Sequence, residues 1–290
     1  MSEPSARGAR SGAQSEGAIE SPPPMPISLS LPGVSVGPAP ATTPRGSAEI
    51  VLRDPARRNA LGRAMFDALE SALRRVGAHE GVSAVILHGE GSAFCAGFDL
   101  EEAVADPNAM GDFIVRLGGV LRTIRRLPMP VIAVAHGAAL AGGCALLSAC
   151  DFVVVAADAT LGYPVHRIGV SPAVTTPTLA SAIGPGPSRA LLLSGELIDG
   201  HAAVRVGLAF RAAEDAASAL AEGRRLAERL AEKGPVALRA TKAWLNELDG
   251  SLDDRRFDGA TAASTALAAG AEATALLRRF WESRREARRS

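Results

Sequence analysis

Short apolar runs alternate with amphipathic stretches along most of this chain, and this alternation predicts its fold. Apolar runs bounded by glycine, proline or charged residues are typical of buried strands, and we expect strands at 27–31, 48–52, 82–88, 131–135 and 152–155. After the second of these runs, residues 62–76 carry apolar side chains at helical spacing, namely Met65, Phe66, Leu69, Leu73 and Val76. Strands that alternate with helices predict an α/β fold with a parallel sheet and right-handed crossovers.

A glycine pair, Gly142-Gly143, stands at the start of the helix expected between the strands at 131–135 and 152–155. The first N–H groups of a helix have no internal partner, and the helix dipole is positive there. Glycines remove the Cβ atoms that would keep an anion, or an oxygen that becomes anionic during a reaction, away from these groups. The simpler interpretation is that the glycines only permit close packing. Taken alone, the stretch favours that interpretation, because isolated glycine pairs are common.

The remaining patterns are mostly helical. We expect a long loop at 32–46, a helix that begins near Asp99, and further helices at 113–127, 178–183, 189–193, within 195–208, and at 215–232, 235–248, 251–269 and 272–288. The first 26 residues are rich in Ser, Pro, Gly and Glu, which is typical of a disordered tail, with a transit peptide as the weaker alternative. We therefore divide the chain into this tail (1–26), an α/β core (27–210) and a C-terminal helical region (211–290). That last region either mediates assembly or only covers the core.

Charge and apolar content restrict the partners. The 290 residues carry a formal net charge of +0, which does not favour nucleic acid as a partner. The long apolar stretch 131–157 is interrupted by His136, Asp151 and glycine turns, so its pieces are too short to cross a membrane. The N-terminus has no continuous apolar segment of the kind found in secretory signals. These features favour a cytoplasmic protein with no membrane partner.

The chain has three cysteines, Cys95, Cys144 and Cys150, and none has the spacing of a metal site. We expect them to be small buried side chains in a reducing compartment, and we expect no metal. Cys144 is the one candidate for a nucleophile, because it lies near the start of the helix that follows the glycine pair.

Five segments, taken together, resemble the enoyl-CoA hydratase/isomerase (crotonase) family. They are DPARRNAL (54–61), AFCAGFDL (93–100), PVIAVAHGAALAGGCALLSACD (130–151), RALLLSGE (189–196) and GPVALRATK (234–242). Each is weak alone, but they occur in the family's order and spacing. The resemblance implies a crotonase-like spiral of ββα repeats whose C-terminal helices build a homotrimer or a hexamer. It also implies an acyl-CoA thioester as substrate, with no separate cofactor because CoA enters as part of the substrate.

The resemblance also assigns a site. Its oxyanion hole would be the backbone N–H groups of Phe98 and Gly142, and removal of one such donor typically slows a reaction by about 10²–10³. The residues that would contact the substrate are Arg58, Ala60, Ala96, Gly97, Phe98, Asp99, Leu100, Gly142, Ala145, Pro164 and Val165. Arg58 would approach the CoA phosphates or would be a solvated turn residue. Asp99 is expected to cap the following helix rather than act as an acid.

The chain departs from the family at two positions where hydratases carry glutamates, since Ala145 and Val165 stand there. Hydration needs a base for water and an acid for the α-carbon, so this departure matters. His166 is the nearest residue that titrates around neutral pH, and it is our candidate base, ahead of Tyr163. His166 lies one residue after Val165, the position of the family's second glutamate. On an extended backbone a shift of one residue turns a side chain to the opposite face, so packing is the simpler role for His166 and Tyr163.

Three hypotheses follow. The first is an acyl-CoA enzyme that stabilises a thioester enolate and is nominally of the hydratase/isomerase type. The second is a catalytically silent subunit for acyl-CoA binding or assembly. The third keeps the enzyme but changes the reaction, for example to thioester hydrolysis or decarboxylation.

Overall fold

The computed structural model describes residues 29–31, 33–37 and 46–287, so the tail expected at 1–26 lies outside the described residues. A seven-stranded sheet forms its centre in the order β1-β2-β3-β4-β5-β7-β10. The strands are β1 Leu29–Leu31, β2 Gly33–Gly37, β3 Ser47–Arg53, β4 Ala84–Gly89, β5 Val131–Ala135, β7 Phe152–Ala156 and β10 Arg211–Ala213. From β3 to β10 every neighbouring pair is parallel, as expected, whereas β1, β2 and β3 pair antiparallel.

The expectation of a loop throughout 32–46 is wrong, because β2 occupies Gly33–Gly37 and pairs with β3, with Val36 opposite Ile50. The segment GVSVG has only two apolar residues between glycines, too few to show a strand period. Its strand conformation is decided by the hydrogen bonds that the edge of β3 offers, which a local pattern does not reveal.

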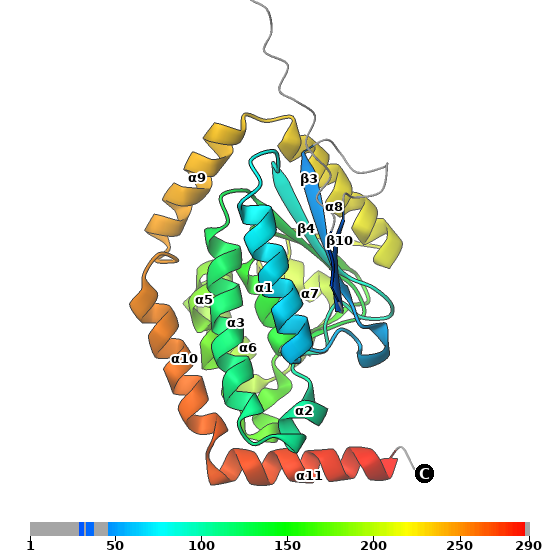
Figure 1. Cartoon of the computed structure of the whole chain (residues 1–290), viewed down its shortest axis with the longest axis vertical. Helices are drawn as coiled ribbons and strands as arrows, with labels where there is room; N and C mark the ends of the chain where they lie inside the picture. The colour runs from blue at the N-terminus through cyan, green and yellow to red at the C-terminus, as the bar shows by residue number, and fades with distance from the viewer. Residues whose placement is uncertain (1–28, 32, 38–45, 288–290) are drawn as a thin grey trace, which may run out of the picture.

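The central strands are buried on both faces, which explains their continuous apolar sequences. In β4, Val85 and Leu87 face a large core shared with helices α1 (Arg63–Gly77) and α3 (Ala109–Arg126). The alternate residue Ile86 faces a smaller core beneath helix α8 (Ala216–Ala231). Figure 1 shows α1 and α3 on one side of β3 and β4 and α8 on the other.

A second sheet of three short strands lies beside the first and was not predicted. Its strands β6 (Ala138–Leu140) and β8 (Thr160–Gly162) are parallel, and β9 (Leu197–Ile198) is antiparallel to β8. Strands of two or three residues are too short for any period to be read from sequence. β6 matters for the site, because helix α4 (Gly142–Ala149) begins two residues after it.

Several shorter helices connect these elements. They are η1 Pro55–Arg57, α2 Leu100–Ala105, η2 Pro164–Ile168, η3 Pro172–Thr175, α5 Thr176–Ile183, α6 Pro185–Ser194 and α7 Gly200–Arg205. At the C-terminus follow α9 Pro235–Leu248, α10 Asp254–Ala268 and α11 Ala271–Ala287. In Figure 1, α9 and α10 run along one side of the molecule and α11 crosses its end next to α2. α10 packs on α3 and η3, and α11 packs on η2 and α2.

We predict that Gly169→Ala will detach α11 from η2. Gly169 has a φ of 69° and caps η2, and a Cβ atom there would lie 2.6 Å from Cα of Ala273 in α11. The left-handed conformation alone costs an alanine about 1–2 kcal/mol, and the backbone clash adds to this. We expect a lower urea midpoint and faster proteolysis within α11.

Gly195→Ala is the matched control for this prediction. Gly195 has nearly the same conformation, with φ 63° and ψ 17°, but the nearest contact of a Cβ atom would be an ordinary 3.4 Å. Gly195→Ala should lose only the stability that the left-handed conformation costs an alanine, and it should leave α11 protected from proteolysis. Equal proteolysis of the two variants would contradict the proposed contact between Gly169 and α11.

Candidate active site

A strained residue sets the direction in which α4 begins. Ala141 has φ 50° and ψ −114°, a conformation that alanine rarely adopts. Its N–H donates to the carbonyl of Gly162 in β8 at 2.8 Å, and the N–H of Leu140 donates to the carbonyl of Cys95 at 3.0 Å. Such strain persists only where the surroundings hold it, and it is concentrated at functional sites. Here these contacts fix the residue immediately before Gly142.

The segment around Phe98 lies against this helix start. Leu61 donates to the carbonyl of Gly97 at 2.8 Å and accepts from the N–H of Asp99 at 3.1 Å. In a parallel bridge of this kind the residue between the two bonds directs its own N–H away, so the Phe98 N–H faces away from Leu61. Gly97 has a φ of 97°, and a Cβ atom on it would lie 3.7 Å from the backbone nitrogen of Gly142. Within the described residues, neither the Phe98 N–H nor the Gly142 N–H donates to another protein group.

A small cavity of about 20 Å³ adjoins these two segments. Most of its lining is apolar, and its polar side chains are three hydroxyls: the lining residues are Phe98, Ile114, Leu117, Ala141, Gly142, Tyr163, Val165, Val170, Ser171, Pro172, Val174 and Thr175. The Phe98 ring is held by two other rings, with centroids 6.3 Å from Phe66 and 5.7 Å from Phe113. No side chain that lines this cavity carries a charge at neutral pH.

Buried hydroxyls join behind the cavity in one network. The Tyr163 hydroxyl lies 3.3 Å from Oγ1 of Thr175, and Oγ of Ser148 in α4 lies 2.7 Å from Oγ1 of Thr178. Oγ of Ser148 lies 3.4 Å from Oγ1 of Thr175, and this contact links the two pairs. Burial raises the pKa of the Tyr163 phenol well above its usual value. The phenol therefore stays protonated at neutral pH and is not a base.

Asn59 joins the turn at 54–61 to the loop that precedes Phe98. It is fully buried with a φ of 55°, and its Nδ2 donates to the carbonyls of Glu90 at 2.9 Å and Ala93 at 2.8 Å. Its Oδ1 accepts from the N–H of Asp54 at 2.8 Å. This positioning role of the side chain was missed from sequence. The signal for it was an asparagine inside a turn, where a positive φ is tolerated.

The expected site residues divide into three groups. Phe98, Gly142 and Val165 line the cavity, whereas Ala145 is buried in α4 and does not line it. Around them Ala60, Ala96, Leu100 and Pro164 are half-buried, Gly97 is buried, and Arg58 is exposed with a φ of 54°. Asp99 is confirmed as the cap of α2, since its Oδ1 accepts from the N–H groups of Glu101 at 2.9 Å and Glu102 at 3.2 Å.

Two candidates for chemistry are not brought to the cavity. His166 is exposed on η2 and does not line the cavity, and its Nδ1 would lie 4.0 Å from a Cβ atom on Gly195. Its candidate role as a base has no support from this position. All three cysteines are confirmed as buried and unpaired, and burial raises the pKa of Cys144 to about 12. A thiol of this kind is a poor nucleophile.

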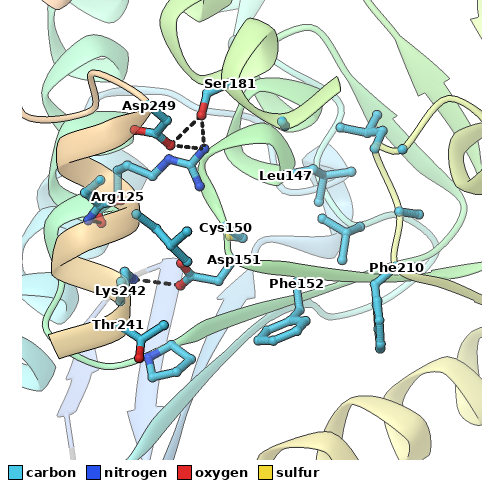
Figure 2. Close-up of a pocket in the computed structure, with 18 of the residues that line it drawn as sticks. Arg125, Leu147, Cys150, Asp151, Phe152, Ser181, Phe210, Thr241, Lys242 and Asp249 are labelled. Atoms are coloured by element: carbon cyan, nitrogen blue, oxygen red, sulfur yellow. Dashed lines mark hydrogen bonds and ion pairs between the residues drawn. The ribbon is translucent and has the colours of Figure 1, made fainter. Parts of the chain in front are cut away.

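A larger hollow of about 860 Å³ lies at the opposite end of the sheet, where β5 and β7 begin beneath α9. Figure 2 shows its charged groups paired with one another: Lys242 with Asp151, and Arg125 with Asp249 and Ser181. None of the residues predicted to hold substrate lines it. We therefore assign the candidate active site to the smaller cavity.

Comparison with known proteins identifies the family to which this chain belongs. The model of the enoyl-CoA hydratase/isomerase family matches residues 42–285, which is most of the chain. The chain belongs to the enoyl-CoA hydratase/isomerase family. A Thermus thermophilus relative, whose name assigns it provisionally to the enoyl-CoA hydratases, is 39% identical over 213 residues, which cover 71% of this chain and 83% of the relative. The crotonyl-CoA hydratase of Syntrophomonas wolfei is 32% identical, over 69% of this chain and 78% of its own.

Solved structures agree with this membership. The crystal structure of an enoyl-CoA hydratase/isomerase from Xanthobacter autotrophicus Py2 superposes with a TM-score of 0.73 at 30% identity, over 80% of this chain and 88% of that one. The expected crotonase-like α/β fold is thereby confirmed. Within the described residues, no helix combines the length and the apolar character needed to cross a membrane.

Proposed function

We propose that this protein binds an acyl-CoA thioester and stabilises its enolate, with the thioester oxygen held by the N–H groups of Phe98 and Gly142. The observation that carries the proposal is the close approach of these two segments at Gly97, where each contributes a backbone donor with no protein partner. Gly142 is also the first residue of α4, where the helix dipole favours negative charge. The names of the relatives, which are enoyl-CoA hydratases, support the thioester as ligand.

The nominal reaction class is that of the hydratases and isomerases, but the residues do not favour hydration. The two positions that resemblance to the family gives to glutamates hold Ala145 and Val165, and the lining of the cavity contains no carboxylate. Without a group to activate water, the donors can polarise the thioester but cannot complete hydration. A catalytically silent acyl-CoA-binding subunit is the second candidate, and the small apolar cavity favours it.

A binding titration beside an activity assay tests the proposal. We expect acetyl-CoA to bind, and crotonyl-CoA to keep its conjugated absorbance in the presence of the protein. Failure of both thioesters to bind would refute the proposal. Rapid hydration would show that groups other than the two glutamates supply acid and base, and His166→Ala would then be the first variant to measure.

We propose that the protein assembles with further copies of itself through α9, as a homotrimer or hexamer. The buried side chains of this helix are polar, Lys242 and Asn246, whereas Val236, Trp244 and Leu248 are 78%, 64% and 69% exposed. An amphipathic helix normally buries its apolar face, so this inverted arrangement suits a helix that a partner covers.

The three buried free thiols further support a reducing, cytoplasmic location.

For this assembly we predict that Leu248→Asp will lower the molar mass in solution toward that of one chain. A charge in a packed apolar interface costs several kcal/mol unless it is paired, which outweighs a typical assembly contact. Light scattering after size-exclusion chromatography measures the mass. Leu267→Asp on α10, where the leucine is also exposed, is the matched control and should leave the mass unchanged. A wild-type protein that runs as one chain would contradict the proposal.

A further inference from the structure

One segment supplies much of the wall of the cavity beside Gly142. Four of the residues that line the cavity lie in η3 or directly before it, namely Ser171, Pro172, Val174 and Thr175. The cavity has a volume of about 20 Å³, which is the space of roughly one or two water molecules. The position of η3 therefore decides how large a group the cavity can hold.

A buried serine of α10 holds the beginning of η3. Oγ of Ser264 donates to the carbonyl of Ser171 at 3.0 Å and accepts from the N–H of Val174 at 2.8 Å. The exposed fraction of Ser264 is 0%, so water does not compete for these bonds. One hydroxyl thus joins two main-chain groups that are 93 and 90 residues away from it in the chain.

Ser264 does not use its hydroxyl as serines and threonines inside helices commonly do. Such a hydroxyl often bonds to the carbonyl four residues earlier in its own helix. The neighbouring Thr265 follows this rule, with its Oγ1 2.9 Å from the carbonyl oxygen of Thr261. Ser264 lies on the buried face of α10 with Phe257 and Ala268, and its hydroxyl bonds to the start of η3 instead. The bonds are therefore a specific contact between α10 and the cavity wall.

The end of η3 is held by other elements. Oγ1 of Thr175 lies 3.4 Å from Oγ of Ser148 in α4 and 3.3 Å from the hydroxyl of Tyr163. A displacement of η3 would break these bonds and those to Ser264, and each buried polar group left without a partner costs free energy. The hydrogen bonds at both ends of η3 thus keep the cavity small.

We propose that Ser264 is a positioning residue that fixes η3 and thereby restricts the acyl group of the bound thioester to one with few atoms beyond its carbonyl. This inference rests on the proposed function, because it takes an acyl-CoA thioester as the ligand. It goes further in assigning the choice of the acyl group to α10. Ser264 acts through η3, since it does not itself line the cavity.

Binding of two thioesters to three proteins tests the inference. Acetyl-CoA and hexanoyl-CoA are titrated by calorimetry into the unaltered chain, Ser264→Ala and Thr265→Ala. For the unaltered chain we expect the Kd of hexanoyl-CoA to be at least about tenfold higher than that of acetyl-CoA, because the longer chain must displace η3. Ser264→Ala should lower this ratio about tenfold, because displacement of η3 then breaks fewer hydrogen bonds. Thr265→Ala is the matched control, and it should leave the ratio unchanged.

The ratio of the two Kd values separates positioning from a general loss of stability. A variant that only weakens the fold weakens the binding of both thioesters alike, so an unchanged ratio in folded Ser264→Ala would overturn the inference. Ser264→Cys keeps a weakly hydrogen-bonding group and should give an intermediate ratio. Hydrogen exchange adds a measurement that needs no ligand. The amide of Val174 should exchange at least about tenfold faster in Ser264→Ala than in Thr265→Ala, and equal exchange would contradict the role of Ser264.

The unaltered chain gives a test that does not depend on the folding of any variant. Equal affinity for acetyl-CoA and hexanoyl-CoA would overturn this inference and leave the proposed function standing. Failure of both thioesters to bind would refute the proposed function, and this inference with it.

Discussion

Gly143→Ala is expected to destabilise the fold by more than about 3 kcal/mol. A Cβ atom on Gly143 would lie inside van der Waals distance of the carbonyl oxygen of Cys95 and 3.0 Å from its carbon. Both are backbone atoms, and that oxygen also accepts the hydrogen bond from Leu140, so it cannot turn aside cheaply. The start of α4 would have to move away from the segment that contains Phe98. Urea denaturation followed by circular dichroism measures the loss.

Gly119→Ala is the matched control for this substitution. Gly119 is exposed within α3, and no atom lies within 4 Å of the position that its Cβ atom would take. Alanine there should stabilise the protein by about 0.5–1 kcal/mol, because glycine is a poor helix former. Similar urea midpoints for the two variants would show that α4 does not pack on Cys95 as closely as described.

Asp151→Ala is expected to lower the free energy of unfolding by about 3–5 kcal/mol, because it leaves the buried ammonium of Lys242 without its counter-charge. Oδ2 of Asp151 lies 2.6 Å from Nζ of Lys242 and accepts from the N–H of Val131 at 2.7 Å. Lys242 is almost fully buried, and its other partner within 3.0 Å is the carbonyl of Met129. The pair thus joins α9 to the beginning of β5 and β7 (Figure 2).

The pH dependence of this variant can be predicted in sign. Burial lowers the pKa of Lys242 below its usual value even with Asp151 present, and removal of Asp151 should lower it further. Between the lowered pKa and the usual one, the unfolded chain binds more protons than the folded chain, so stability rises with pH. The deficit of Asp151→Ala should therefore shrink as the pH rises through that range.

Glu90→Ala serves as the control for loss of an ion pair at the surface. Glu90 lies 2.7 Å from Nε of Arg53, but both side chains are half-exposed, and the carbonyl of Glu90 that binds Asn59 is retained. Water screens such a pair, so we expect Glu90→Ala to lower the free energy of unfolding by less than about 1 kcal/mol. If Asp151→Ala lost no more stability than Glu90→Ala, the ammonium of Lys242 would have to reach solvent once the carboxylate of Asp151 is removed. That result would contradict the predicted cost of an unpaired buried charge.

The sequence determined the larger elements and the family. The strands β3, β4, β5 and β7 and the helices α1, α3 and α8 follow from apolar runs and helical periods, because burial on one or two faces leaves a direct trace in the residues. The cap at Asp99 followed from local chemistry, since its side chain bonds to groups two and three residues away. The order of five segments was enough to recognise the enoyl-CoA hydratase/isomerase family.

Only the tertiary structure decided the features that depend on residues far apart in the chain. The strand β2 exists because β3 offers it hydrogen bonds, and Gly143 must be glycine because the carbonyl of Cys95 lies against it. The small volume of the cavity, the position of His166 outside it and the exposed apolar face of α9 were equally invisible in the sequence. A sequence pattern reports how much of a side chain is buried, but not which distant atoms bury it, and the chemistry of this site depends on those atoms.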